Sequence, residues 1–115
     1  VIKICHKFNI IPIWCPIKKY KFKKKNPLDF GGNGFSIVIE FSSHEHGENK
    51  TRNFISELNN KIIEQGGHYY LAKDEIIDSN NFKSTYPKYN EFLDIKKKYD
   101  PETILISEQF KRLFK

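Results

Sequence analysis

The chain has 115 residues, 38% of them apolar, and a formal net charge of +6 at neutral pH. This length suits one domain or part of one, and the apolar fraction is enough for a hydrophobic core. No apolar run approaches the roughly 20 residues that span a bilayer, no secretory signal is visible, and two cysteines do not make a disulfide framework, so we expect a reduced, cytoplasmic protein.

The chain predicts a helix at its start, followed by extended segments. Four apolar residues there recur at helical spacing: Val1, Ile4, Cys5 and Phe8. Asn9 would end this helix, and because the sequence opens inside it without an initiator Met, we expect a fragment. Residues 10–15 predict a buried strand that the neighbouring prolines keep short or at an edge. Residues 17–22 suit a strand or an extended loop.

The clearest strand pattern covers residues 35–41, after a turn-rich connection predicted at Asn26-Pro27 and at Gly31 to Gly34. Its odd-numbered residues are large and apolar and should face a core: Phe35, Ile37, Ile39 and Phe41. Ser36, Val38 and Glu40 point the other way, toward a more polar environment such as a cleft.

The rest of the chain predicts mainly helices. After a polar loop, Thr51 is expected to cap a helix with one apolar stripe, and Gly66-Gly67 to end it. The stripe consists of Phe54, Ile55, Leu58, Ile62 and Ile63. Residues 68–71 predict a short strand. Three brief helices should follow, starting near Asn80, near Tyr89 and at Ser107.

This order of elements predicts an α+β fold, with a mainly antiparallel sheet covered by helices. Few motifs point to chemistry. His44-Glu45-His46 could hold a metal only with further ligands that the sequence does not place, so we expect a solvated loop and no metal.

A second alternative comes from the cluster Lys18 to Lys25, in which Tyr20 and Phe22 are interleaved with lysines. Aromatic rings between cations can stack on bases while the cations meet phosphates. The cluster therefore allows a basic, non-enzymatic module that binds nucleic acid or an anionic surface. A solvated loop is the simpler interpretation for most of these lysines.

Gly66 to Asp74 forms a different pattern, in which a helix stop leads into a short aromatic run that ends in Ala72-Lys73-Asp74. A lysine just past such a run can project into a cleft and hold an anion. On physical grounds alone, Lys73 would be a surface lysine paired with Asp74.

This run resembles part of the C-terminal region of FAD-linked oxidases of the vanillyl-alcohol-oxidase superfamily. The residues downstream that carry the same resemblance are Phe82, Tyr86-Pro87, Phe92, Asp100-Pro101, Ser107 and Arg112-Leu113. The decaprenylphosphoryl-ribose oxidase type is the most similar. Asn26 to Phe30 and the strand up to Phe41 also fit. The resemblance implies that residues 1–100 are the second half of the substrate (cap) domain, and that residues 101–115 return toward a missing N-terminal FAD-binding domain.

The resemblance also implies a function. The complete enzyme would oxidise a secondary alcohol of a small-molecule sugar, with FAD as hydride acceptor, and a lipid-linked substrate would bring it to a membrane. The fragment alone should bind no FAD and be inactive, and a nucleic-acid partner becomes less favoured. The residue implied to be catalytic is Lys73, and those implied to line the substrate and flavin pocket are Tyr70, Lys18, Tyr20, Ser36 and Val38.

The implied missing domain should leave an apolar surface uncovered. We expect this surface at the C-terminal helix, from Phe110, Leu113 and Phe114.

Overall fold

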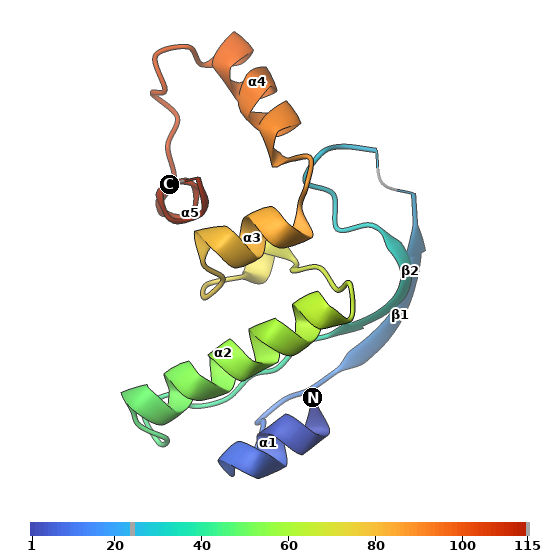
Figure 1. Cartoon of the computed structure of the whole chain (residues 1–115), viewed down its shortest axis with the longest axis vertical. Coiled ribbons are helices and arrows are strands. Elements are labelled where there is room, and N and C mark those ends of the chain that lie inside the picture. The colour runs from blue at the N-terminus through green and yellow to red at the C-terminus, as the bar shows by residue number, and fades with distance from the viewer. Residues whose placement is uncertain (24, 115) are drawn as a thin grey trace. The chain divides into compact units, whose positions relative to one another are not determined.

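The computed structural model describes residues 1–23 and 25–114, which form two compact units (Figure 1). The first unit contains residues 1–23 and 31–62, and the second contains residues 25–30 and 63–114. The elements in chain order are α1 (Ile2–Phe8), β1 (Ile17–Phe22), β2 (Gly32–Ile37), α2 (Glu48–Glu64), the 3₁₀ turn η1 (Leu71–Lys73), α3 (Ser79–Thr85), α4 (Tyr89–Tyr99) and α5 (Glu108–Leu113). The α+β class is confirmed.

The core of the first unit lies between α1, α2 and the segment after β2. Ile4 and Cys5 of α1 and Phe54 and Leu58 of α2 are buried together with Ile10. Ile39 and Phe41 pack against this cluster, as do Phe8, Ile55 and Ile62. The helical stripes predicted from the sequence are thus confirmed except at Val1, which is exposed and precedes α1, and at Ile63, which is not part of this cluster. The end of α1 is confirmed at Asn9, which adopts the left-handed conformation at φ 46°.

Helix α2 begins earlier than predicted. Its first residue is Glu48, and the Thr51 amide already donates to the Gly47 carbonyl oxygen at 3.1 Å. Thr51 therefore lies inside the helix and does not cap it. A carboxylate in the first turn is favourable at the positive end of the helix dipole, which favours the early start at Glu48. The end of α2 is as expected, since Gly66 follows it with φ 64°.

Strands β1 and β2 form an antiparallel pair with a register from Ile17 opposite Ile37 to Phe22 opposite Gly32. The predicted turn at Gly31 to Gly34 is wrong, because Gly32 and Gly34 lie within β2. The turn predicted at Asn26-Pro27 is confirmed and covers Asn26 to Leu28, where the Asp29 carboxylate accepts hydrogen bonds from the Lys25 and Asn26 amides at 2.8 and 2.9 Å.

The buried strand predicted at residues 10–15 is absent, and only Ile10 there is buried. Trp14 forms an isolated antiparallel bridge with Glu40, in the same register as the β1–β2 pair. Pro16 explains the break in the ladder. Its carbonyl oxygen accepts from the Val38 amide at 3.2 Å, but proline has no N–H to donate in return. The same break ends β2 at Ile37, short of the predicted Phe41.

The expected core face of residues 35–41 is only half buried. Ile39 and Phe41 reach the core cluster, but Phe35 and Ile37 are 66% and 42% exposed. Helices α1 and α2 pack against the chain only beyond Ile37, so the predicted core face is confirmed at Ile39 and Phe41. It is wrong within β2, where the even-numbered residues are the half-buried ones.

The second unit is built on aromatic side chains that join α3, α4 and α5. The Phe114 ring contacts Phe82, Phe92 and Phe110 at centroid distances of 5.0, 5.4 and 4.7 Å. Asp78 caps α3 and Ser107 caps α5, each accepting from an amide of the first turn. The three predicted short helices are confirmed, whereas the predicted strand at 68–71 is absent, and Leu71 opens the turn η1.

The predicted exposure of the C-terminal helix is also wrong. Leu113 is 1% exposed, and Phe110 and Phe114 are half-buried in the aromatic cluster. The exposed apolar residues lie just before that helix, at Ile104, Leu105 and Ile106. None of the helices in the described residues is long and apolar enough to cross a membrane.

Candidate functional site

Lys73 ends the turn η1, and its side chain is exposed. Its amide donates to the Tyr70 carbonyl oxygen at 3.0 Å, which closes the turn. Its ammonium has no hydrogen bond or ion pair with any residue that the structure describes. This charge is therefore available to an anionic group outside the unit.

The expected pairing of Lys73 with Asp74 does not occur. The Asp74 carboxylate accepts from the Ile76 and Ile77 amides at 3.3 and 3.1 Å, and it forms an ion pair with Arg112 at 3.0 Å. The Asp74 side chain is 6% exposed. Because the carboxylate already has these three donors, it does not compete for the neighbouring ammonium.

Helix α5 holds the segment around Lys73 through backbone carbonyls. Gln109 donates to the Leu71 carbonyl oxygen at 2.6 Å. Arg112 donates to the carbonyl oxygens of Ile77 at 2.8 Å and Asp74 at 3.1 Å. Residues nearly 40 positions apart are thus joined, and the sequence alone predicts no role for Gln109 or Arg112. The only signal was that Arg112 belongs to the resemblance.

Tyr70 and Tyr69, which precede η1, differ in burial. The Tyr70 ring is half exposed and meets the Phe30 ring edge-on at 5.6 Å. Tyr69 is buried, and its carbonyl oxygen accepts a hydrogen bond from the Tyr86 hydroxyl. Burial, with smaller contributions from the charges of Asp74 and Asp78, raises the pKa of Tyr69 to about 12. Tyr69 is therefore a neutral structural residue, and Tyr70 is the one whose ring is accessible.

In the first unit, one face of the β1–β2 pair collects the other predicted pocket residues. Lys18 lies opposite Ser36, and Tyr20 lies opposite Gly34. Side chains of cross-strand partners share a face, and Val38 follows Ser36 by two residues on that face. A Cβ at Gly34 would lie 3.8 Å from the Tyr20 hydroxyl oxygen, so the glycine leaves room for the ring. The face combines a cation, a hydroxyl and an aromatic ring.

The six predicted site residues thus fall into two groups, one in each unit. Lys18, Tyr20, Ser36 and Val38 share a sheet face in the first unit, and Tyr70 and Lys73 share a turn in the second.

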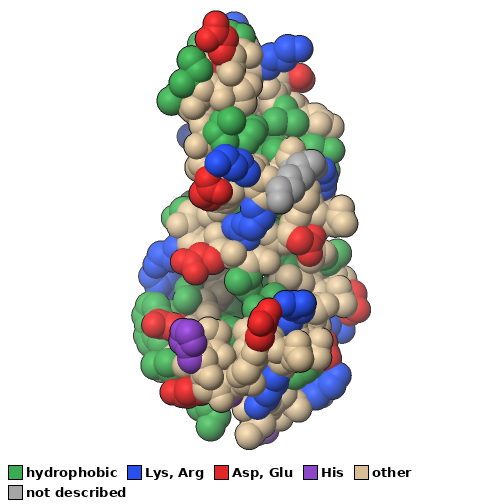
Figure 2. Space-filling view, turned by 90° about the vertical axis from the view of Figure 1, so that its left-hand side faces the viewer, with side chains coloured by type: hydrophobic (Ala, Val, Ile, Leu, Met, Phe, Trp, Pro, Cys, Tyr) green, Lys and Arg blue, Asp and Glu red, His purple; other side chains and the backbone are tan. Residues whose placement is uncertain are grey.

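Strand β1 places the side chains of the cluster Lys18 to Lys25 on two different faces. Lys19 and Lys21 lie on one face of β1, while Lys18, Tyr20 and Phe22 lie on the other. Lys24 is outside the described residues. On the surface shown in Figure 2, basic and acidic side chains are interspersed. The alternation separates the two lysines from the aromatic rings, which does not favour the nucleic-acid alternative.

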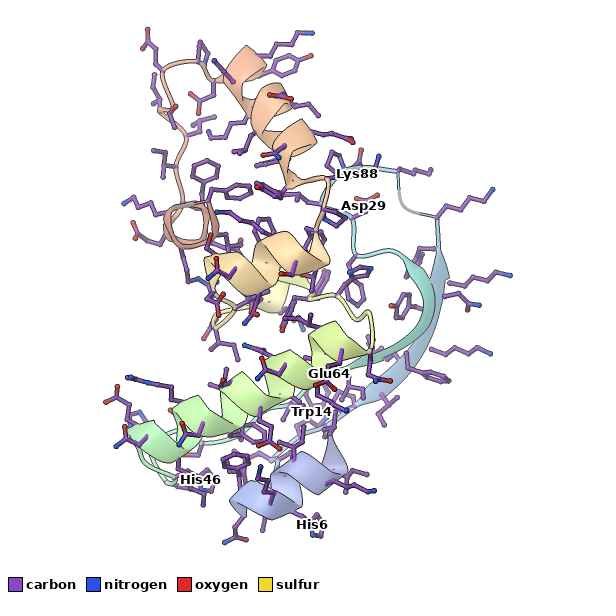
Figure 3. All side chains as sticks on the ribbon, in the orientation of Figure 1. His6, Trp14, Asp29, His46, Glu64 and Lys88 are labelled. Atoms are coloured by element: carbon purple, nitrogen blue, oxygen red, sulfur yellow. The ribbon has the colours of Figure 1, made fainter. Side chains whose placement is uncertain are left out.

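No set of three or more His, Cys, Asp or Glu side chains in residues 1–23 and 25–114 is placed to hold a metal ion. His46 precedes α2, and His6 lies on α1 (Figure 3). A pocket in the second unit contains none of the six site residues. Its lining comes from Lys25, Asn26, Pro27, Thr85, Tyr86, Pro87, Lys88 and Glu91.

Comparison with known proteins adds a family to this geometry. The family model of D-arabinono-1,4-lactone oxidase matches residues 13–113. The chain belongs to the D-arabinono-1,4-lactone oxidase family. The resemblance to FAD-linked oxidases is thereby confirmed, and the matched region includes all six site residues as well as Gln109 and Arg112.

Among curated proteins, the chain is similar to the decaprenylphosphoryl-beta-D-ribose oxidase of Mycolicibacterium smegmatis. The two are 30% identical over 91 residues, which cover 76% of this chain and 18% of the relative. The chain thus spans less than a fifth of the length of the relative it matches.

The described residues fit a flavin neighbour. Tyr70 offers an exposed aromatic edge, and Lys73 offers an ammonium that no described carboxylate neutralises. Both are groups that can contact a flavin ring or hold charge on it.

Proposed function

We propose that this chain is the C-terminal, substrate-binding part of an FAD-dependent oxidoreductase that oxidises a secondary alcohol of a sugar or sugar-like substrate. The observation that carries the proposal is the free ammonium of Lys73, because its neighbouring carboxylate is taken by Arg112. Membership of the oxidase family and the sugar in the relative's name support the substrate class.

When bound in the complete enzyme, FAD would accept the hydride from the carbinol carbon. The chain's own residues would bind and orient. Lys73 would contribute positive charge where negative charge develops, which lowers the barrier more than it strengthens ground-state binding. Tyr70 would pack against the flavin or the substrate.

On the sheet face, Lys18 and Ser36 would donate hydrogen bonds to sugar hydroxyls or a phosphate, and Tyr20 would cover an apolar sugar face. Val38 adds an apolar contact. A ligand held by several such groups reacts faster, because binding has already oriented the reacting atoms and less entropy is lost on reaching the transition state.

We also propose that residues 101–115 dock onto the FAD-binding part of the same polypeptide, which would be the main partner of this chain. Ile104 and Leu105 are 74% and 77% exposed, although Asp100 and Lys96 hold their backbone. A loop with its backbone held by hydrogen bonds and two aliphatic side chains exposed to solvent suits a protein surface, and more than four fifths of the relative's length lies outside the match.

The test of the proposed function is Lys73→Ala in the complete oxidase. We expect flavin reduction by saturating substrate to slow by roughly 10²–10³-fold, with little change in melting temperature. Lys97→Ala, which removes an exposed lysine of α4, is the matched control and should leave the rate unchanged. Equal rates in Lys73→Ala and wild type would refute the assignment of Lys73.

The alternative function, a basic module that binds nucleic acid or an anionic surface, predicts a different result in a binding assay. An isolated chain that bound nucleic acid through the Lys18 cluster would lose affinity steeply as salt rises. We expect no such salt-dependent binding.

A further inference from the structure

We propose that Arg112 and Gln109 are positioning residues for Lys73, so that helix α5 determines where the ammonium is presented and keeps it free of Asp74. This inference rests on the proposed function of Lys73 and goes beyond it, because it assigns a role in the reaction to side chains that touch neither flavin nor substrate.

The contacts lie on both sides of Lys73. Before it, the Leu71 carbonyl oxygen accepts from Gln109 at 2.6 Å. After it, the carbonyl oxygens of Asp74 and Ile77 accept from Arg112 at 3.1 and 2.8 Å. The segment is therefore fastened to α5 at three carbonyls, with Lys73 between them.

The segment needs such fastening because it has little regular structure of its own. Between the end of α2 and the start of α3, only Leu71–Lys73 is helical, as a single 3₁₀ turn. One 3₁₀ turn has few and poorly aligned hydrogen bonds. A lysine also has a long, flexible side chain, so its backbone must be fixed if the ammonium is to occupy one place.

The second part of the role is electrostatic. Asp74 follows Lys73 directly and would be its nearest counter-ion. Arg112 instead pairs with the Asp74 carboxylate at 3.0 Å, and the fork of the guanidinium also spans two carbonyl oxygens. An ammonium paired with Asp74 would have less positive charge to offer a developing anion.

Helix α5 is itself well anchored, which a positioning element requires. Leu113 is 1% exposed, the Ser79 hydroxyl donates to the Leu113 carbonyl oxygen at 2.8 Å, and Ser107 caps the first turn. Gln109 and Arg112 lie three positions apart and so project from the same side of the helix.

The experiment is a double-mutant cycle in the complete oxidase. Arg112→Lys keeps the charge but cannot span three acceptors, and we expect flavin reduction to slow about 10- to 100-fold, as a misplaced catalytic group does. In a Lys73→Ala background the same change should slow it less than about twofold, because a positioning residue has no effect once its target is gone.

Arg52→Lys is the matched control, since it makes the same substitution in an exposed pair with Glu48 on α2. It should leave the rate unchanged in both backgrounds. Gln109→Met removes the bond to the Leu71 carbonyl oxygen and the longer one, at 3.5 Å, to the Asp74 carbonyl oxygen, but leaves the Arg112–Asp74 ion pair in place. It provides a milder second variant, which carries the test if Arg112→Lys fails to fold.

Two readouts do not depend on turnover. Amide hydrogen exchange of the peptide that contains residues 71–77 should speed up in Arg112→Lys and Gln109→Met, but not in Arg52→Lys. The rate at which an amine-selective acylating reagent modifies Lys73 should fall in Arg112→Gln, which, unlike Arg112→Lys, leaves the Asp74 carboxylate without its cation and so lets it pair with the Lys73 ammonium.

Equal losses from Arg112→Lys in the Lys73 and Lys73→Ala backgrounds would overturn the inference and leave Arg112 a structural residue. Unchanged exchange of residues 71–77 would overturn it as well. If Lys73→Ala itself has no effect on flavin reduction, the proposed function of Lys73 fails instead, so the two failures are distinguishable.

Discussion

Lys96 and Asp100 form a nearly buried ion pair at the end of α4, with side chains 13% and 11% exposed. The Lys96 ammonium also donates to the Leu105 carbonyl oxygen at 2.8 Å. The Asp100 carboxylate accepts from the amides of Ile104 and Leu105 at 2.8 and 3.0 Å. One pair of side chains thus holds the backbone of the loop that presents the exposed aliphatic residues.

The first prediction concerns the pH dependence of this pair. The hydrogen bond from Lys96, followed by those from Ile104 and Leu105, lowers the pKa of Asp100 below its ordinary value of 3.8. A lowered pKa contributes stability that is present above 3.8 and is lost as the pH falls through the lower value. We therefore expect Asp100→Asn to lower the melting temperature at pH 7, and the difference from wild type to shrink below pH 4. A constant difference from pH 7 to pH 2 would contradict this origin.

The second prediction tests the docking surface. Leu105→Ser should leave the melting temperature of the isolated chain nearly unchanged, because the side chain is 77% exposed. In the complete oxidase it should weaken the retention of FAD during dialysis, since the two parts would separate more easily. Ile2→Ser, at a 75% exposed position on α1, is the control. If both variants keep FAD equally well, Leu105 does not dock.

Tyr69 provides a third prediction, at alkaline pH. Burial raises its pKa from 10.0 to about 12, so its ionisation opposes folding. The stability is complete below pH 10 and is lost as the pH rises toward 12, by up to roughly 2–3 kcal/mol. We expect urea unfolding at pH 8 and pH 11 to show a smaller loss for Tyr69→Phe than for wild type. Parallel losses would show that Tyr69 does not ionise with the fold intact.

A fourth prediction compares the cost in stability of replacing Gly66 and Gly34. Gly66 has φ 64°, so Gly66→Ala should cost about 1 kcal/mol in free energy of unfolding. Gly34 has no such φ, and its nearest contact to an added Cβ is 3.8 Å from Tyr20, so Gly34→Ala should change stability by less than about 0.5 kcal/mol. Gly34→Val should displace the Tyr20 ring and raise the KM of the complete oxidase. Chemical denaturation and steady-state kinetics check both halves.

The sequence predicted the features that depend on neighbours along the chain. The stripe at Phe54 and Leu58, the helix end at Asn9 and the cap at Ser107 follow from helical spacing and local hydrogen bonding. The family also followed from the sequence, because the spaced motif around Lys73 lies in the matched region.

Tertiary structure decided what depends on partners far apart in the chain. Spacing could not show that Arg112 takes the carboxylate of Asp74, 38 residues away, and so leaves Lys73 free. Nor could alternation show that helices α1 and α2 cover Ile39 but not Phe35. The physical reason is that periodicity fixes the direction of a side chain, whereas burial and pairing depend on which distant segment packs there.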